Sequence, residues 1–321
     1  MSELNFDYIK DLTGNSEEII PMDEFMERTW VNPELESKWY DNYSKNKSSI
    51  QPAKQRNDGR VAILVGASPG INKNYEVLKN IDDNFVIISS LPAAKFLVDN
   101  DIIPDFVFAV DAAYHNLDDL DFDHSGTTLV TSPFVMPEIL NAWTGKAETY
   151  LLGGGKGFNE TIIEDWGKHD IGGGNVISAA YLWAYKYLQC RHFIVMGVSL
   201  CFYKDYYFDG RKKPNETPDE YNGWYNAVDI YGEVVSTTPT LTMYKTWFET
   251  YVKHINEHGG GSFINSTEDG ILGAYPELVA SDKEESTFRL KFIPWISIVP
   301  LSVAIEGHKL RLRENNNGSR N

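Results

Sequence analysis

Apolar residues gather in short continuous runs that begin near residue 60. The run at 61–65, Val-Ala-Ile-Leu-Val, is typical of a strand buried on both faces of a sheet. The same pattern predicts further strands at 85–89, 106–110 and 193–196 and a late strand at 262–264, with weaker candidates at 127–131 and 149–152.

Helical stretches separate most of these strands, at 70–80, 92–100, 175–188 and 241–258. Strands that alternate with helices imply a parallel sheet with right-handed crossovers. The sequence therefore predicts an α/β fold with a largely parallel sheet and helices on both faces.

The polar and acidic residues 1–55 predict an N-terminal extension, in which Trp30, Trp39 and Tyr40 are candidate anchors. Residues 42–60 are rich in Asn, Ser, Lys and Gln, which is typical of a linker. A nucleotide-binding domain is expected at 56–285. A C-terminal segment with a disordered tail after Asn315 is expected at 286–321.

Aromatic residues crowd the stretch 202–231, which is long for a connection inside a compact domain. Such insertions are commonly functional lids. Tyr and Trp suit a surface that is dry only when ligand is bound. We expect a lid here, with a permanent packing interface as the alternative.

The net charge of −17 argues against extended binding to nucleic acid, which requires a basic face. No apolar stretch approaches the length of about 20 residues that spans a membrane, and the N-terminus lacks a secretory pattern. The two cysteines give no disulfide framework. The sequence therefore predicts a cytoplasmic protein without a membrane span, and self-association stays open.

Two glycine-rich turns are candidate ligand sites. The first, Gly66, Ala67, Ser68, Pro69 and Gly70, follows a buried strand, where ligands of parallel sheets collect. The second, Gly172, Gly173 and Gly174, leads through Asn175 into a helix that contains Ser178. A helix N-terminus suits an anion, although Asn175 can also act purely as a cap. We expect both turns to line one pocket.

Acid–base and metal candidates are few. Asp111 follows the third strand, where a carboxylate can contact a ribose or hold Mg²⁺. A plain turn former is its structural alternative. His169, near the second glycine turn, is the best histidine for acid–base chemistry.

At this point the ordered motifs resemble the MptE-like family, also called DUF115. The resemblance covers roughly 60–280 and is carried by 65–71, 103–105 with 110–111, 173–176 with 179–180, 193–197 and 264–270. The family includes Mg²⁺- and ATP-dependent 6-hydroxymethyl-7,8-dihydropterin pyrophosphokinases and motility-associated factor proteins. Its core is similar to the Rossmann-like fold of sialyltransferases that use CMP-sialate.

The resemblance implies that the glycine turns face a nucleotide and that tyrosines of the lid contact its phosphate. Tyr203, Tyr206 and Tyr207 are the candidates, with Tyr206 also a catalytic candidate. Where the family often has Asn and Asp, this chain carries Ser90 and Ser199, which we include among the nucleotide contacts.

Three functions follow from the resemblance. The first is a transferase that moves a CMP-activated, sialate-like sugar to an acceptor sugar or protein. The second is a Mg²⁺-dependent pyrophosphokinase that uses ATP and a pterin. The third is a non-catalytic module that binds a nucleotide or sugar.

Overall fold

The computed structural model describes residues 33–113, 116–153, 170–171, 174–203, 208–209, 225–258, 260–279 and 287–318. These residues divide into two compact units. Unit I contains 33–66 and 83–191, and unit II contains 67–82 and 192–318.

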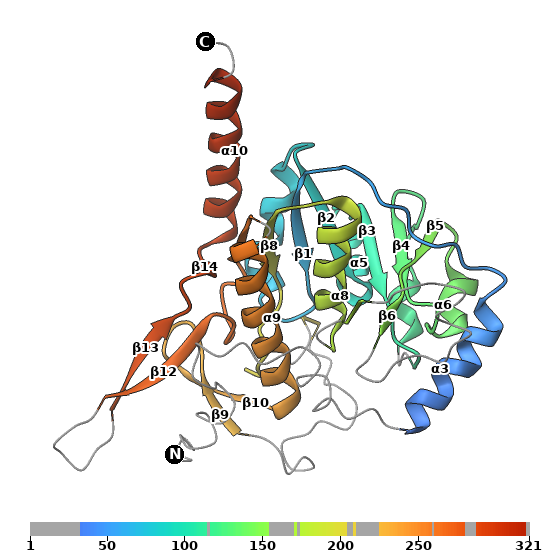
Figure 1. The fold of residues 1–321 in the computed structure, drawn as a ribbon, viewed down its shortest axis with the longest axis horizontal. Coiled ribbons are helices and arrows are strands. Elements are labelled where there is room, and N and C mark those ends of the chain that lie inside the picture. Colours follow the sequence, from blue (N-terminus) through green and yellow to red (C-terminus); the bar gives the residue numbers. More distant parts are fainter. Residues whose placement is uncertain are drawn as a thin grey trace. The chain divides into compact units, whose positions relative to one another are not determined.

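The unit I strands pair in the order β1-β2-β3-β4-β5, and three strands of unit II pair in the order β14-β11-β8. The pairings within each of these sets are all parallel, so the predicted α/β class with a largely parallel sheet is confirmed. Unit I supplies five strands that lie side by side (Figure 1): β1 (Val61–Val65), β2 (Phe85–Ser90), β3 (Phe106–Ala109), β4 (Thr128–Thr131) and β5 (Lys146–Thr149).

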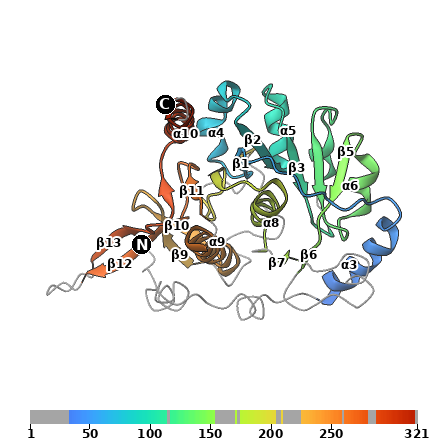
Figure 2. The same ribbon diagram turned by 45° about the horizontal axis from the view of Figure 1, so that its top comes forward.

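Helices cover both faces of the unit I strands, as Figure 2 shows for α5 (Leu91–Asp99) and α8 (Val176–Trp183). Trp183 of α8 packs edge-on against Phe106 and Phe108 of β3, at centroid distances of 4.8 and 5.4 Å. Val107, the β3 residue between them, packs on the α5 side. The alternation along β3 therefore separates an α8 face from an α5 face.

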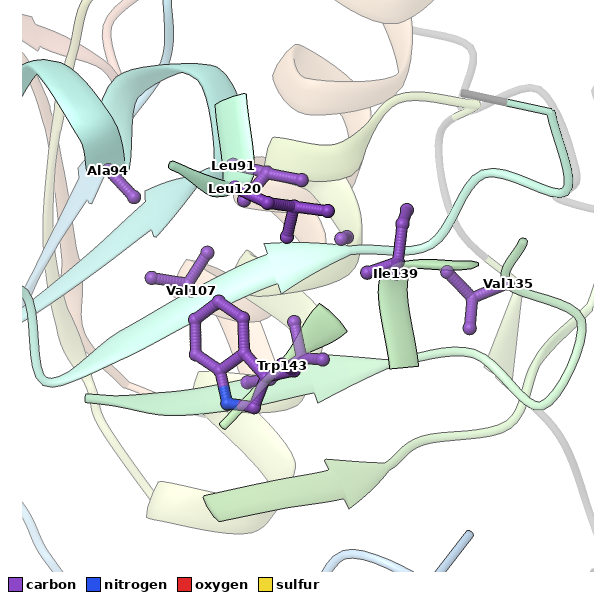
Figure 3. Packing of buried hydrophobic residues seen from close by; sticks show 9 residues of the cluster. Leu91, Ala94, Val107, Leu120, Val135, Ile139 and Trp143 are labelled. Atoms are coloured by element: carbon purple, nitrogen blue, oxygen red, sulfur yellow. The ribbon is translucent and has the colours of Figure 1, made fainter. Parts of the chain in front are cut away.

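The α5 face carries a compact hydrophobic cluster (Figure 3). The cluster contains Leu91 and Ala94 of α5, Val107 of β3 and Ile139 of the short helix α6 (Pro137–Ala142). Leu120, from the 3₁₀ helix η2 (Leu117–Leu120), and Trp143 complete the packing. Burial of this apolar surface fixes α5 against the strands, so the end of β2 is held in place.

The predicted linker at 42–60 is wrong in its first part, because helix α3 runs from Pro33 to Asn46. Asn42 donates its side-chain amide to the carbonyls of Ala112 and Phe134 at 2.9 and 3.0 Å. Asn46 donates in the same way to Pro133 and Val135. These asparagines are buried, and their amides satisfy the carbonyls of a neighbouring loop. Composition alone does not show whether a polar side chain is buried in this way or exposed to solvent, which is why the segment was predicted to be a linker.

The weaker strand candidate at 149–152 is displaced. The strand is β5, at 146–149, and only the two-residue β6 (Leu152–Gly153) follows, paired with β7 (Asp170–Ile171). β5 lies at the edge of the sheet and exposes Lys146 and Ala147, so it lacks the apolar run of a central strand.

Unit II supplies the other three parallel strands, β8 (His192–Met196), β11 (Ser262–Asn265) and β14 (Ser297–Ile298). It also has the hairpins β9 (Tyr225–Val228) with β10 (Val234–Thr237) and β12 (Ala274–Val279) with β13 (Thr287–Phe292). Its helices are α4 (Ile71–Asn74), the 3₁₀ helix η1 (Tyr75–Asn80), α9 (Pro239–His258) and α10 (Leu301–Gly318).

The sequence pattern did not predict either hairpin or α10. β9 lies inside the stretch expected to be a lid, most of which falls outside the described residues. α10 extends to Gly318, beyond the residue after which a disordered tail was expected. None of the helices in the described ranges has the length and apolarity that crossing a membrane requires.

Candidate functional site

The carboxyl end of β2 in unit I carries two buried serines whose hydroxyls have no hydrogen-bond partner among the described residues, Ser89 and Ser90. Ser90 lies opposite Phe108 in the parallel register, so it belongs to the α8 face. Ser89 lies opposite Val107 and belongs to the α5 face. Ser90 also precedes α5 without capping it through its side chain.

The N-terminus of α8 lies at the same edge of the unit I strands. The last turn beyond α8, the π-helical η3 (Ala184–Leu188), ends where Leu188 accepts a hydrogen bond from Asp58, just before β1 begins. Since this end of the helical run lies at the amino edge of the sheet, the opposite end points to the carboxyl edge. Exposed Gly174 and partly buried Asn175 are found there.

Asn175 caps the N-terminus of α8, which is the alternative role that the sequence analysis gave it. Its Oδ1 accepts from the Ser178 N–H at 2.9 Å, and the Ser178 hydroxyl donates back to the Asn175 carbonyl at 2.7 Å. The Asn175 Nδ2 has no partner among the described residues. The β2 edge, defined here as Ser90, Gly174 and Asn175, therefore presents a hydroxyl and an amide beside a helix N-terminus, and neither has a partner in the part of the chain that the structure describes.

A second polar cluster lies in unit II. The Ser68 Oγ is 2.7 Å from the Ser199 Oγ and accepts from the Ser199 N–H at 3.2 Å. The Ser199 hydroxyl also donates to the Oδ1 of Asp269. We call Ser68, Ser199 and Asp269 the serine–aspartate chain. It joins the turn before α4 to the loops that follow β8 and β11.

Lys73 pairs with the second oxygen of Asp269. Its Nζ is 3.1 Å from the Asp269 Oδ2 and donates to the Glu268 carbonyl at 2.8 Å. Burial raises the pKa of the Asp269 carboxyl, and the bonds from Ser199 and Lys73 oppose that effect. Gly70 closes the site from one side, because a Cβ there would lie 2.8 and 2.9 Å from the two carboxylate oxygens.

Tyr203 connects Asp229 to the loop that contains Asp269 and Gly270. Its hydroxyl donates to Asp229 at 2.9 Å and accepts from the Gly270 N–H at 2.7 Å. Burial raises the pKa of Tyr203 above its usual range. The hydroxyl is thus already committed to two partners, and its role as a phosphate contact stays a prediction.

Asp111 is exposed and lies two residues beyond β3, with its carbonyl accepting from the Met136 N–H at 3.0 Å. Within the described ranges, no three His, Cys, Asp or Glu residues come together as a metal site would require. The two Asp269 oxygens are already bonded to Ser199 and Lys73. The role of Asp111 as a magnesium ligand stays a prediction.

Several candidates lie outside the described residues, namely Gly172, Gly173, His169, Tyr206 and Tyr207. The expectation that the two glycine turns line one pocket stays a prediction for the same reason. Of the remaining candidates, the structure brings Ser68 together with Ser199, and Asn175 together with Ser178.

Sequence reasoning missed Asp269 and Lys73. The rule that singled out Asp111, a carboxylate just past a buried strand, applies equally to Asp269, four residues after β11. Lys73 gave no such signal, because a lysine in the turn after a glycine loop is most often a solvated charge.

A family model described as 6-hydroxymethylpterin diphosphokinase MptE-like matches residues 37–205, just over half of the chain. Among curated proteins, none matches the chain.

Among solved structures with a similar fold is that of the MAf glycosyltransferase from Magnetospirillum magneticum AMB-1. The TM-score is 0.55 at 17% sequence identity, over 83% of this chain. The match spans 39% of that protein's chain, so much of the other protein has no counterpart here. At this identity the likeness establishes the fold alone.

Proposed function

Because the chain belongs to the MptE-like family, we propose that it is a nucleotide-dependent transferase of the glycosyltransferase type. The single observation that carries the proposal is the β2 edge, where the hydroxyl of Ser90, a residue 3% exposed, and the amide of Asn175 find no partner among the described residues beside a helix N-terminus. A buried polar group without a partner costs about 1–3 kcal/mol. A nucleotide that bonds these groups removes that cost.

The donor we propose is a CMP-activated, nonulosonic (sialate-like) sugar. The α8 N-terminus suits its single phosphate, and the Ser90 hydroxyl suits an acceptor on the ribose or base. The fold likeness to a protein titled a glycosyltransferase supports this class of reaction. The sugar and its acceptor come from the resemblance of the sequence motifs rather than from the geometry.

A diphosphokinase is the second candidate, because the family description names one. Transfer of a diphosphoryl group from ATP relies on divalent ions held by carboxylates. The described residues offer no such group, and Asp269 is paired with Lys73. We therefore place the glycosyltransferase first.

Thermal shift with CMP, CDP, ATP plus Mg²⁺ and a pterin separates these candidates. We expect CMP and CDP to raise the melting temperature in the presence of EDTA. Stabilisation by ATP that appears only with Mg²⁺, or by the pterin, would instead favour the diphosphokinase.

Ser90 and Ser89 provide a matched pair of variants for this measurement. Both are buried and neither hydroxyl has a partner within the described ranges, but only Ser90 lies on the α8 face. Ser90→Ala should weaken CMP binding about tenfold, the value of one hydrogen bond, whereas Ser89→Ala should leave it unchanged. Equal effects of the two substitutions would contradict the β2 edge as the binding site.

A further inference from the structure

Three basic side chains gather where helix α10 packs against strand β8, within unit II. His308 of α10 and His192 of β8 have ring centroids 5.3 Å apart. Arg311 follows His308 by one helical turn, and side chains three positions apart on a helix are neighbours. We call His192, His308 and Arg311 the basic cluster.

The two histidines differ in how their ring nitrogens are bonded. The His192 Nδ1 lies 3.0 Å from the hydroxyl of Ser262 on β11, a contact that fixes the orientation of this ring. The Nε2 of His308 has no partner among the described residues, although His308 is only 5% exposed. A buried polar atom without a partner is costly unless a further group bonds it. The basic cluster therefore offers a hydrogen-bonding atom that the described residues do not use.

No carboxylate of the described residues is among the groups that shift the pKa values of these histidines. Burial lowers the pKa of both rings, Arg311 lowers both further, and His192 adds to the effect on His308. Lys309 of the same helix differs from Arg311, because its ammonium group pairs with Glu306 at 3.3 Å. The basic cluster is thus a local positive site in a chain of net charge −17, and the field at a site depends on its own surroundings.

The cluster is open to solvent on one side. Arg311 is exposed and His192 is partly exposed, whereas His308 lies behind them. A small dissolved ion can therefore reach the guanidinium group and the His192 ring. The charge of Arg311 repels a cation and attracts an anion.

We propose that the basic cluster binds a tetrahedral oxyanion of the phosphate or sulfate type. Arg311 is its main contact, since a guanidinium presents paired N–H donors that match an oxyanion. Both rings donate to the anion when they are protonated, because an imidazolium has a proton on each nitrogen. The anion links α10 to β8, and it is independent of the β2 edge and of the transferase reaction.

Anion binding is coupled to protonation of the histidines. A negative charge beside the rings favours their protonated form and so raises their pKa values. By linkage, the affinity for the anion increases as the pH falls through the histidine range and is lowest above it. Sulfate is the main probe, because it remains a dianion throughout that range.

NMR titration of the histidine rings from pH 4 to pH 8 tests the site, in sodium sulfate and in sodium chloride of equal ionic strength. We expect sulfate to raise the pKa of His192 and of His308 by about one pH unit, which corresponds to a tenfold preference of the anion for the protonated ring. The exposed His258 should show the same pKa in both salts. Equal pKa values of His192 and His308 in the two salts would overturn the site.

Arg311→Gln and Arg289→Gln are a matched pair of variants. Both remove one exposed positive charge from unit II, but Arg289 lies on β13 and outside the basic cluster. Arg311→Gln should abolish the effect of sulfate on His192, whereas Arg289→Gln should preserve it. An effect of sulfate that survives in Arg311→Gln, or that is lost equally in both variants, would contradict the role of Arg311.

Inorganic phosphate and CMP, added in place of sulfate at pH 6, identify the source of the anion. A larger protonated fraction of His192 with phosphate alone indicates a free inorganic anion, and the same response to CMP indicates a phosphate carried by a nucleotide. Either response supports the site. A response of the two rings to zinc chloride, with none to any of the anions, would show a metal-binding pair of histidines and overturn it.

Discussion

At the scale of single residues, the backbone at Gly270 controls the geometry of the serine–aspartate chain. Gly270 has φ +84°, and a Cβ there would lie 2.3 Å from the Ser199 carbonyl oxygen. Gly270→Ala should therefore destabilise the protein by about 2–4 kcal/mol, from the left-handed backbone and the clash together. Urea unfolding measures this change.

Gly232 separates the two contributions. Its φ is nearly the same, +88°, but nothing lies within 4 Å of an added Cβ. Gly232→Ala should cost only the backbone term of about 1–2 kcal/mol. Equal losses in the two variants would show that the contact with Ser199 has no energetic consequence.

At the scale of elements, α3 is held against the rest of unit I by hydrogen bonds from asparagine side-chain amides as well as by apolar contacts. Asn46→Ala would leave the carbonyls of Pro133 and Val135 without the donor that they now share. We expect a loss of about 1–3 kcal/mol in unfolding free energy. Ser44→Ala, on the exposed side of the same helix, should change it by less than about 0.5 kcal/mol. A comparable loss in both variants would contradict the anchoring role of Asn46.

The contact of α10 with β8 should respond to acid. Burial lowers the pKa of His308 to about 4 and lowers the pKa of His192, whose ring is 5.3 Å away. The unfolded chain binds protons that the folded histidines exclude, so stability is full above about pH 6.5 and falls toward pH 4. His308→Leu should flatten this decline in urea titrations from pH 7 to pH 5. The exposed-site variant His258→Gln should keep it, and an unchanged slope in His308→Leu would contradict this account.

At the scale of the whole molecule, the charge of −17 opposes an anionic ligand. Screening at higher salt should therefore strengthen CMP binding slightly, by about twofold between 20 and 200 mM. Titration calorimetry at the two salt concentrations measures the effect. Marked weakening by salt would show that a basic site, absent from the β2 edge, dominates binding.

The sequence predicted the central strands and helices, because a central strand is buried on both faces and its residues, such as Val61 and Ile63, are therefore all apolar. It was insufficient for β5 and α3, where exposed or polar side chains are held by pairing and by loop carbonyls. Within the candidate site, turn chemistry pointed to Ser68 and Asn175. Asp269 follows a strand as Asp111 does, so the same rule could have singled it out, whereas Lys73 became visible only through its contact with Asp269.

The most direct test of the central claim is a crystal structure of the protein with CMP bound. The account predicts that the nucleotide lies at the carboxyl end of β2, with the Ser90 hydroxyl and the Asn175 Nδ2 each within about 3.2 Å of a ligand oxygen or nitrogen. CMP bound elsewhere, with the Ser90 hydroxyl still lacking a partner, would contradict it.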